Sequence, residues 1–297
     1  MIVDRDSRLM ILITMNSKIQ FRMMLIAVGL FISGIQPGLG DPSVASASVD
    51  TPPVDSTTRK LVDIREVVKA DDEGGFLRPR FSPDGLQLML TRPGYQGIFL
   101  VPTKGGQAKR ISEDNAFKAE WSKDGLIALP APNDKRRILK RDGSQARIEA
   151  VEHEQVFCEN DKVFTEVEEG ANPVAISDNS DRFIAPQLCP KHKMVSFVGV
   201  ESGIYLAPAS ASREPVFLGE GQDVTWAPDS SFIVYVHARD DGHEIVESDL
   251  YQYELRTKKL FNLTATSDLM INSPSLSPDG KTVAFEAEGT IYVGTIQ

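Results

Sequence analysis

A four-residue turn, Ser-Pro-Asp-Gly, occurs at residues 82–85 and again at 277–280. Two imperfect copies lie between them, Ser-Lys-Asp-Gly at 122–125 and Ala-Pro-Asp-Ser at 227–230. In such a turn Pro fixes φ, Asp bonds to the nearby backbone and Gly supplies a positive φ, so the chain reverses between two β-strands. A turn that recurs every few tens of residues predicts an array of similar supersecondary units.

Each copy of the turn follows a bulky apolar residue, which we call the anchor of its unit. The gaps between successive anchors are 40, 36, 31, 38 and 50 residues, close to the length of a four-stranded propeller blade. The third and fourth copies are degraded, with Asn160-Asp161 and Lys191-His192 in place of Asp-Gly. The anchors are Phe81, Trp121, Phe157, Leu188, Trp226 and Leu276.

This spacing predicts an all-β fold, a six-bladed β-propeller of four-stranded blades. The sixth unit reaches Gln297 with no residues left for an outer strand, whereas residues 60–67 precede the first unit without a partner. We expect this N-terminal strand to complete the last blade, because closure of the ring removes a free sheet edge. An open β-solenoid or sandwich is the alternative.

The N-terminal region has the pattern of a secretory signal. Lys18 and Arg22 precede an apolar run of about 13 residues at 23–35, and small residues follow near 40 and 47. This run is shorter than the roughly 20 residues that a spanning helix needs. We therefore expect a signal peptide over 1–40 (cleavage near 40 or 47), a flexible linker over 41–58, the propeller over 59–297 and no stable membrane span after cleavage, with an uncleaved anchor as the alternative.

The charge balance argues against one class of partner. The formal net charge is -10, and an acidic surface repels the phosphate backbone that nucleic-acid-binding proteins must neutralise. We therefore expect that the protein does not bind nucleic acid. With the signal pattern described above, we expect a periplasmic or secreted protein, and we expect it to be a monomer.

Three segments carry a family resemblance. Residues 80–90, 224–229 and 276–285 resemble the strand-turn-strand signature of the TolB-like, WD-related β-propeller repeats, and the resemblance extends from about residue 60 to the end. It implies a stand-alone propeller without the α/β domain found ahead of the propeller in the family's namesake. It also implies a periplasmic binding role in which a partner docks at one mouth of the ring. Because propellers host many activities, the motif indicates a fold and not a reaction.

Six further positions predict a polar channel. Side chains alternate along a strand, so the residue directly before each anchor faces the opposite way from the anchor. Five of these six residues are polar, although a buried position on the innermost strand is normally apolar, so we expect them to line the central channel. A water-filled pore without function is the alternative. The six are Arg80, Glu120, Val156, Gln187, Thr225 and Ser275, to which the mouth formed by the loops between blades adds Arg78, Lys118, Asp223 and Ser273.

No pattern of catalytic residues is present in the sequence. There is no Gly-x-Ser-x-Gly nucleophile motif, and the four histidines (153, 192, 237 and 243) fall outside the channel positions. Asp240, Asp241 and Glu244 are a weak candidate for a Ca²⁺ site, but a solvated loop is the favoured interpretation, and no cofactor is expected. Cys158 and Cys189 follow their anchors on neighbouring blades; a disulfide needs Cα atoms within about 7 Å, so two small buried thiols are the expectation.

The sequence therefore predicts a non-catalytic scaffold in the cell envelope that binds a protein or peptide at the mouth of the channel. A small molecule or a glycan is an alternative ligand. Two other functions remain open at this point: an enzyme of hydrolase or polysaccharide lyase type with its active site in the channel, and a regulatory propeller of a separate peptidase or kinase.

Overall fold

The structure, a computed structural model, describes residues 53–55, 58–133, 135–151, 155–166, 170–241, 243–265 and 267–297. The chain divides into two compact units. One comprises Val49–Asp241 with Ile245–Gln297 and forms the propeller; the other comprises Met1–Ser48 with Gly242–Glu244 and lies almost entirely outside the described residues. The predicted signal segment falls there. Within the described residues the only helical element is the short 3₁₀ turn η1 (Pro93–Tyr95), and no helix is long and apolar enough to cross a membrane.

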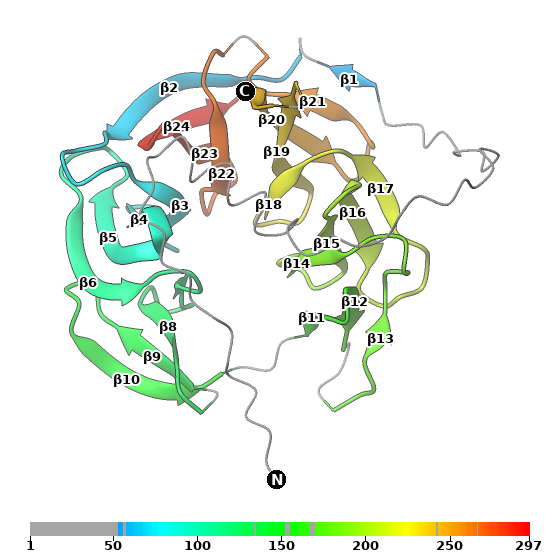
Figure 1. Cartoon of the computed structure of the whole chain (residues 1–297), viewed down its shortest axis with the longest axis horizontal. Helices are drawn as coiled ribbons and strands as arrows, with labels where there is room; N and C mark the ends of the chain where they lie inside the picture. The colour runs from blue at the N-terminus through cyan, green and yellow to red at the C-terminus, as the bar shows by residue number, and fades with distance from the viewer. Residues whose placement is uncertain are drawn as a thin grey trace. The chain divides into compact units, whose positions relative to one another are not determined.

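Six antiparallel sheets form the blades of a ring (Figure 1). We number the blades along the chain from the first inner strand. Blade 1 contains β3 (Leu77–Phe81), β4 (Gln87–Arg92), β5 (Gln96–Pro102) and β6 (Lys109–Asn115). Blade 2 contains β7 (Glu120–Trp121), β8 (Ile127–Ala131), β9 (Lys135–Leu139) and β10 (Gln145–Ala150). Blade 3 contains β11 (Val156–Glu159), β12 (Lys162–Thr165) and β13 (Val174–Ala175).

The second half of the ring follows the same plan. Blade 4 contains β14 (Phe183–Leu188), β15 (Met194–Gly199), β16 (Gly203–Pro208) and β17 (Val216–Gly219). Blade 5 contains β18 (Gln222–Trp226), β19 (Phe232–Asp240), β20 (Ile245–Glu254) and β21 (Leu260–Asn262). Blade 6 contains β22 (Ile271–Leu276), β23 (Thr282–Ala287), β24 (Thr290–Ile296) and, as its outer strand, β2 (Leu61–Val68). The predicted six-bladed β-propeller is confirmed.

The N-terminal strand closes the ring as the sequence predicts. β2 pairs antiparallel with β24, with Leu61 opposite Ile296, and Figure 1 shows the blue strand beside the red one. Leu61 is buried among side chains of blades 5 and 6, and Val67 among those of blades 6 and 1. The closing strand therefore contributes to two interfaces between blades, and not only to its own sheet.

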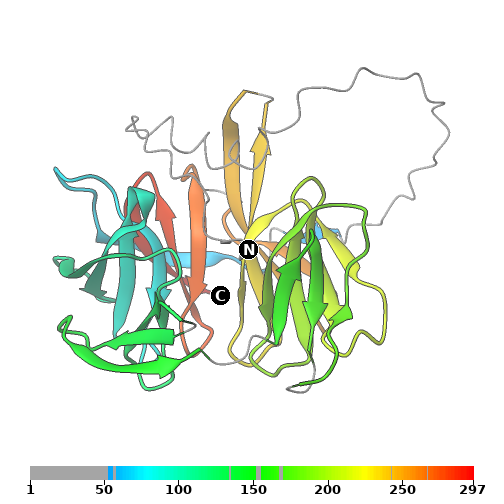
Figure 2. The same cartoon turned by 60° about the horizontal axis from the view of Figure 1, so that its bottom comes forward.

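Two blades depart from the four-stranded plan. Blade 3, whose repeat is the most degraded, has three strands among the described residues. Blade 5 has five, because β1 (Val54–Asp55) pairs in parallel with β21. The β1 residues belong to the segment expected to be a linker. In Figure 2 the β19–β20 hairpin, the longest of the molecule, rises beyond the neighbouring blades.

The Ser-Pro-Asp-Gly turn owes its shape to a bonding pattern that recurs in blades 1, 2 and 6. In blade 1 the Ser82 hydroxyl donates to Asp84 at 2.6 Å and accepts from the Gln87 N–H at 3.0 Å. Ser122 and Ser277 make the equivalent bonds in their turns. In blade 4 a sulfur replaces the hydroxyl: Cys189 Sγ accepts from the N–H groups of Lys193 and Met194, each at 3.3 Å.

The two cysteines are free thiols in different environments. Cys189 is 1 % exposed, as expected for a small residue behind an anchor. The expectation of a second buried thiol is wrong, because Cys158 is exposed. β11 continues two residues past its anchor Phe157, whereas the other inner strands end at their anchors, so Cys158 lies inside the strand and not in the turn.

Apolar side chains between the blades form the core. Five clusters of buried residues each join two neighbouring blades: 1 with 2, 3 with 4, 4 with 5, 5 with 6 and 6 with 1. Within the described residues no such cluster joins blades 2 and 3. In blade 3 the anchor Phe157 stacks on Phe164 of its own sheet at 5.7 Å, and both rings are only half-buried. The weakest repeat in the sequence thus coincides with the weakest interface in the ring.

Candidate binding site at the channel mouth

The residues that precede the anchors lie where the sequence places them, on the six inner strands β3, β7, β11, β14, β18 and β22. The anchors Phe81, Trp226 and Leu276 are 8 to 9 % exposed. The anchors Trp121, Phe157 and Leu188 are half-buried, and all six preceding residues are half-buried or exposed. In blades 1, 5 and 6 the exposure therefore alternates as it does along a strand that packs one face between neighbouring blades.

A β-bulge bends four of these inner strands near the mouth. The pairing of inner strand with its neighbour shifts register in blades 1, 4, 5 and 6, at the residues just before the anchor. In each case the residue three before the anchor has a left-handed φ, between 49° and 53°. None of the four is Gly, so the sequence held no signal for the bulge, and a bulge re-aims the side chains beside it. The four are Arg78, Ala185, Asp223 and Ser273.

Several of the predicted site residues are already used to join blades. The Gln187 side-chain amide donates to the Val224 carbonyl oxygen at 3.0 Å, which ties blade 4 to blade 5. The Ser275 hydroxyl accepts from the Phe81 N–H at 3.3 Å. Asp223 accepts from both the N–H and the hydroxyl of Ser273, at 3.1 and 3.4 Å.

The remaining predicted residues are free to engage a ligand. Within the described part of the chain, no side-chain hydrogen bond or ion pair is made by Arg78, Lys118, Glu120 or Thr225, nor by the guanidinium of Arg80. Arg80 stands out among them, because it is a half-buried cation without a direct partner. The structure thus divides the predicted set into residues that bond to a neighbouring blade and residues whose side chains make no bond within the described part of the chain.

Arg80 has charged neighbours on several blades. Burial lowers its pKa, and the positive charge of Arg78 lowers it further, while Glu120 and Asp223 act in the opposite sense. These groups come from blades 1, 2 and 5. Glu120 and Asp223 are close enough to interact electrostatically with Arg80, but neither forms an ion pair with it. Within the described residues the guanidinium therefore has no bonded counter-charge.

Aromatic side chains extend the cationic group along the rim. The Arg78 guanidinium lies over the Tyr95 ring at 5.3 Å, and Tyr95 meets Phe117 edge-on with centroids 4.9 Å apart. Phe117 is 52 % exposed, unusual for a ring of this size. Sequence reasoning missed both aromatics, because they lie in loops outside the repeated positions.

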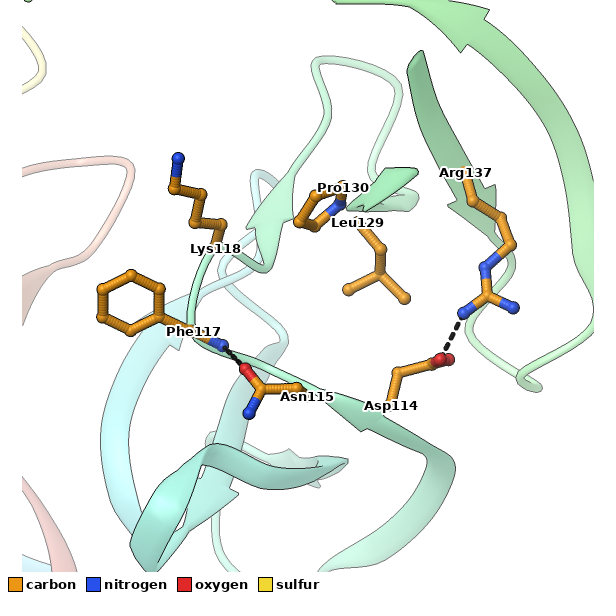
Figure 3. A pocket seen from close by; sticks show the side chains of 7 residues that line it. All are labelled: Asp114, Asn115, Phe117, Lys118, Leu129, Pro130 and Arg137. Carbon is orange, nitrogen blue, oxygen red and sulfur yellow. Dashed lines mark hydrogen bonds and ion pairs between the residues drawn. The ribbon is translucent and has the colours of Figure 1, made fainter. Parts of the chain in front are cut away.

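A small cavity adjoins Phe117 and Lys118. Its volume is about 310 Å³, and Figure 3 shows its lining. Leu129 and Pro130 lie between the loop that carries Phe117 and Lys118 and an ion pair of Asp114 with Arg137. Asn115 fixes the loop by accepting the Phe117 N–H at 2.9 Å. The lining residues are Asp114, Asn115, Phe117, Lys118, Leu129, Pro130 and Arg137.

A buried carboxyl group lies in β23 of blade 6, next to blade 1. Glu286 is 5 % exposed and accepts the Gly289 N–H at 2.6 Å. Burial raises its pKa to about 7, and the charges of Asp223 and Glu288 push in the same direction, against the bonds from Gly289 and Asn272. A signal for it existed in the sequence, since Glu286 is the one charged residue in the apolar strand at 282–287.

The other candidate groups are not gathered into a site. Among the described residues, no group of three or more His, Cys, Asp and Glu side chains could hold a metal ion, although the side chain of Asp240 in the candidate Ca²⁺ loop falls outside that description. His192 Nδ1 lies 2.8 Å from Gln155 Oε1, and His237 contacts the Tyr251 ring. His153 lies outside the described residues.

The fold and the inner strands thus define a β-propeller with a cationic, partly aromatic channel mouth. No protein-family model and no curated protein matches the sequence. Many solved structures resemble the fold, and two of them serve as examples. One is a chain from a crystal structure of the mitotic checkpoint complex, with a TM-score of 0.50, 12 % identity, and coverage of 88 % of this chain and 99 % of that one. The other is an oligogalacturonate lyase from Vibrio parahaemolyticus, with a TM-score of 0.52, 12 % identity, and coverage of 82 % and 98 %. At this identity the likeness concerns the fold alone.

Proposed function

We propose that this protein is a non-catalytic binding propeller of the TolB-like type, exported to the cell envelope, that captures a protein or peptide at the channel mouth. The observation that carries the proposal is Arg80, a half-buried guanidinium that faces the channel with no bonded partner among the described residues. Burying a cation without pairing it is costly, so such a group is retained where a ligand supplies the missing anion.

The arrangement of the mouth supports binding over catalysis. Arg78, Arg80 and Lys118 offer charge, and Tyr95 and Phe117 offer aromatic contact surface, a combination that recurs in protein-binding sites. The described histidines have other contacts, with Gln155 and Tyr251 among them. The checkpoint-complex chain offers one example of this fold within an assembly of proteins.

The test is an affinity pull-down from an envelope fraction, comparing the wild type with an Arg80/Glu120 double alanine variant. We expect the variant to lose its main partner, whereas Lys281→Ala, which removes an exposed cation from a Pro-Asp-Gly turn at the opposite rim, leaves the partner list unchanged. If both variants retain every partner, the assignment of the mouth is wrong. Cell fractionation with and without residues 1–40 tests export separately.

One observation favours an enzyme as the second candidate. Glu286 combines burial with a pKa of about 7, a value suited to general acid or base chemistry at neutral pH. The lyase among the similar structures gives a substrate class to try. Incubation with oligogalacturonate should give no unsaturated product if the protein is a binding scaffold; product formation that Glu286→Gln abolishes would establish the enzyme.

A further inference from the structure

We propose that the mouth binds the free C-terminus of a polypeptide, with the terminal carboxylate on Arg78 and Arg80 and an apolar last side chain in the cavity over Leu129 and Pro130. This inference rests on the proposed function and specifies its ligand.

The two arginines and the apolar cavity form one continuous surface. Arg80 feels the charge of Arg78, whose guanidinium lies over Tyr95. Tyr95 contacts Phe117, and Phe117 lines the cavity. A ligand that reaches the cations therefore passes directly beside the apolar cavity.

The cavity has the size and the lining for one large apolar side chain. About 310 Å³ is at the low end of ligand pockets, enough for one large side chain. The Leu129 side chain is 2 % exposed and Pro130 lies beside it, while Phe117 is half-exposed and available to cover an incoming apolar group. The ion pair of Asp114 with Arg137 closes one side, so neither of these charges is available to a ligand.

The charges around the mouth favour a ligand with a single negative charge. The protein as a whole carries a formal charge of -10, and Glu120 and Asp223 lie near Arg80, so a polyanion would be repelled. A single carboxylate can pair with the two arginines at short range. A chain terminus offers that one charge on the same residue as its last side chain, which matches the adjacency of cations and cavity.

The test uses short probes that differ in one group. Acetyl-Gly-Gly-Phe with a free carboxylate is titrated against the protein and compared with the same peptide as its C-terminal amide. Trp121 fluorescence can report the binding, since its indole nitrogen donates to the Arg80 carbonyl oxygen. We expect the free acid to bind about tenfold tighter than the amide, the size of effect that one charge-assisted contact gives. Equal affinities would overturn the proposal.

Variants separate the two halves of the site. Arg80→Gln should lower the affinity for the free-acid peptide about tenfold. Glu120→Gln should raise that affinity, because the substitution removes a negative charge near Arg80. Phe117→Ser should weaken the Phe-terminated peptide and leave acetyl-Gly-Gly-Gly unchanged. Lys281→Gln is the matched control. Since the two charge variants move affinity in opposite directions, a general loss of fold cannot imitate the pattern.

Two further probes distinguish other carboxylates. Acetyl-Gly-Asp-Gly amide carries an internal carboxylate, and digalacturonate carries sugar carboxylates; either one binding as tightly as the free acid contradicts a preference for a chain terminus. If none of the probes binds while the Arg80/Glu120 variant still loses its partner in the pull-down, this inference fails and the proposed function stands. If the pull-down is unaffected as well, both fail.

Discussion

The Trp121 indole nitrogen donates a hydrogen bond of 3.0 Å to the backbone carbonyl oxygen of Arg80. The anchor of blade 2 therefore holds the blade 1 residue that the proposed site depends on. The second tryptophan anchor does the same elsewhere in the ring, where Trp226 donates to the Ser196 hydroxyl of blade 4 at 2.9 Å. Both tryptophans reach back to the preceding blade, Trp121 to its inner strand β3 and Trp226 to its second strand β15, so they link neighbouring blades as well as filling the core.

Trp121→Phe tests this link. The change removes the donor to the Arg80 carbonyl oxygen while retaining an aromatic ring, and we expect the free energy of unfolding to fall by about 1–2 kcal/mol. Urea denaturation provides the measurement. Trp226→Phe serves as the companion variant, since it strands the fully buried Ser196 hydroxyl and should cost a similar amount. Stability unchanged in both variants would mean that the indole bonds contribute little.

Deletion of residues 59–68 should severely destabilise the propeller. The deletion removes β2, exposes the edge of β24 and takes Leu61 and Val67 out of two interblade clusters. A milder variant, Leu61→Ala, should cost about 2–4 kcal/mol, whereas the exposed Glu66→Ala should cost almost nothing. A wild-type melting temperature after the deletion would disprove closure by the N-terminal strand.

Glu286 should make stability depend on pH near neutrality. Its pKa in the fold, about 7, lies above the ordinary value of 4.5, so the folded state binds the proton more tightly. The stability contributed by this group is therefore complete below pH 4.5 and is lost as pH rises through 7. Glu286→Gln keeps an acceptor for the Gly289 N–H and should remove the dependence, with a gain over wild type at pH 8 of at most about 3 kcal/mol. Parallel pH profiles for the two proteins would argue against a raised pKa.

Asp84 should make stability fall as pH is lowered in the acid range, opposite to the pH dependence expected from Glu286. The Ser82 hydroxyl, with the Leu86 N–H and Arg141, lowers the pKa of Asp84 to about 2. Its contribution is present above the ordinary value of 3.8 and is lost as pH falls through 2. The wild type should therefore exceed Asp84→Asn in stability at pH 5, and this difference should narrow between pH 4 and 2. Ser82→Ala should reduce the difference at pH 5, and thermal melts across this range would show a constant gap if the turn bonds do not lower the pKa.

Gln252 is a place where the fold can be improved. Its side chain is fully buried, and within the described residues neither its amide nitrogen nor its amide oxygen has a hydrogen-bond partner. Because an unpaired buried amide carries a desolvation cost, Gln252→Met should leave stability unchanged or raise it by about 1–2 kcal/mol. The bonded Gln187, replaced by Met as a control, should lose stability instead, since its bond to Val224 is broken. A destabilised Gln252→Met protein would indicate that water satisfies the amide.

Much of the fold was predictable because its determinants are local. The Ser82 turn closes through bonds that span at most five residues, and the same bonds recur in two other blades. Departures from the repeat were predictable only in kind. The degraded third copy indicated a weak blade, but not that Cys158 would stay in the strand and become exposed.

The candidate site was predictable only in part. The sequence placed Arg80 on an inner strand and Arg78 and Lys118 at the mouth formed by the loops between blades, but gave no sign of the cavity beside Phe117. Glu286 was visible as one charge in an apolar strand, but its burial near Asp223 was not. Tyr95 and Phe117 are 22 positions apart in connections of no fixed pattern, and their contact exists because β5 and β6 pair, with Gln96 opposite Asn115.

By itself, then, the sequence determined the repeating turn and the number of blades, because those depend on residues a few positions apart and on alternation along a strand. It also determined the strand that closes the ring, because counting the units leaves the last blade one strand short. The tertiary structure decided which polar residues of the channel remain available. Gln187 bonds to a carbonyl 37 positions away and Ser275 to an N–H 194 positions away, and no local pattern announces such pairs. Ring closure brings those partners together, whereas the guanidinium of Arg80, at an equivalent position, has no bonded partner among the described residues.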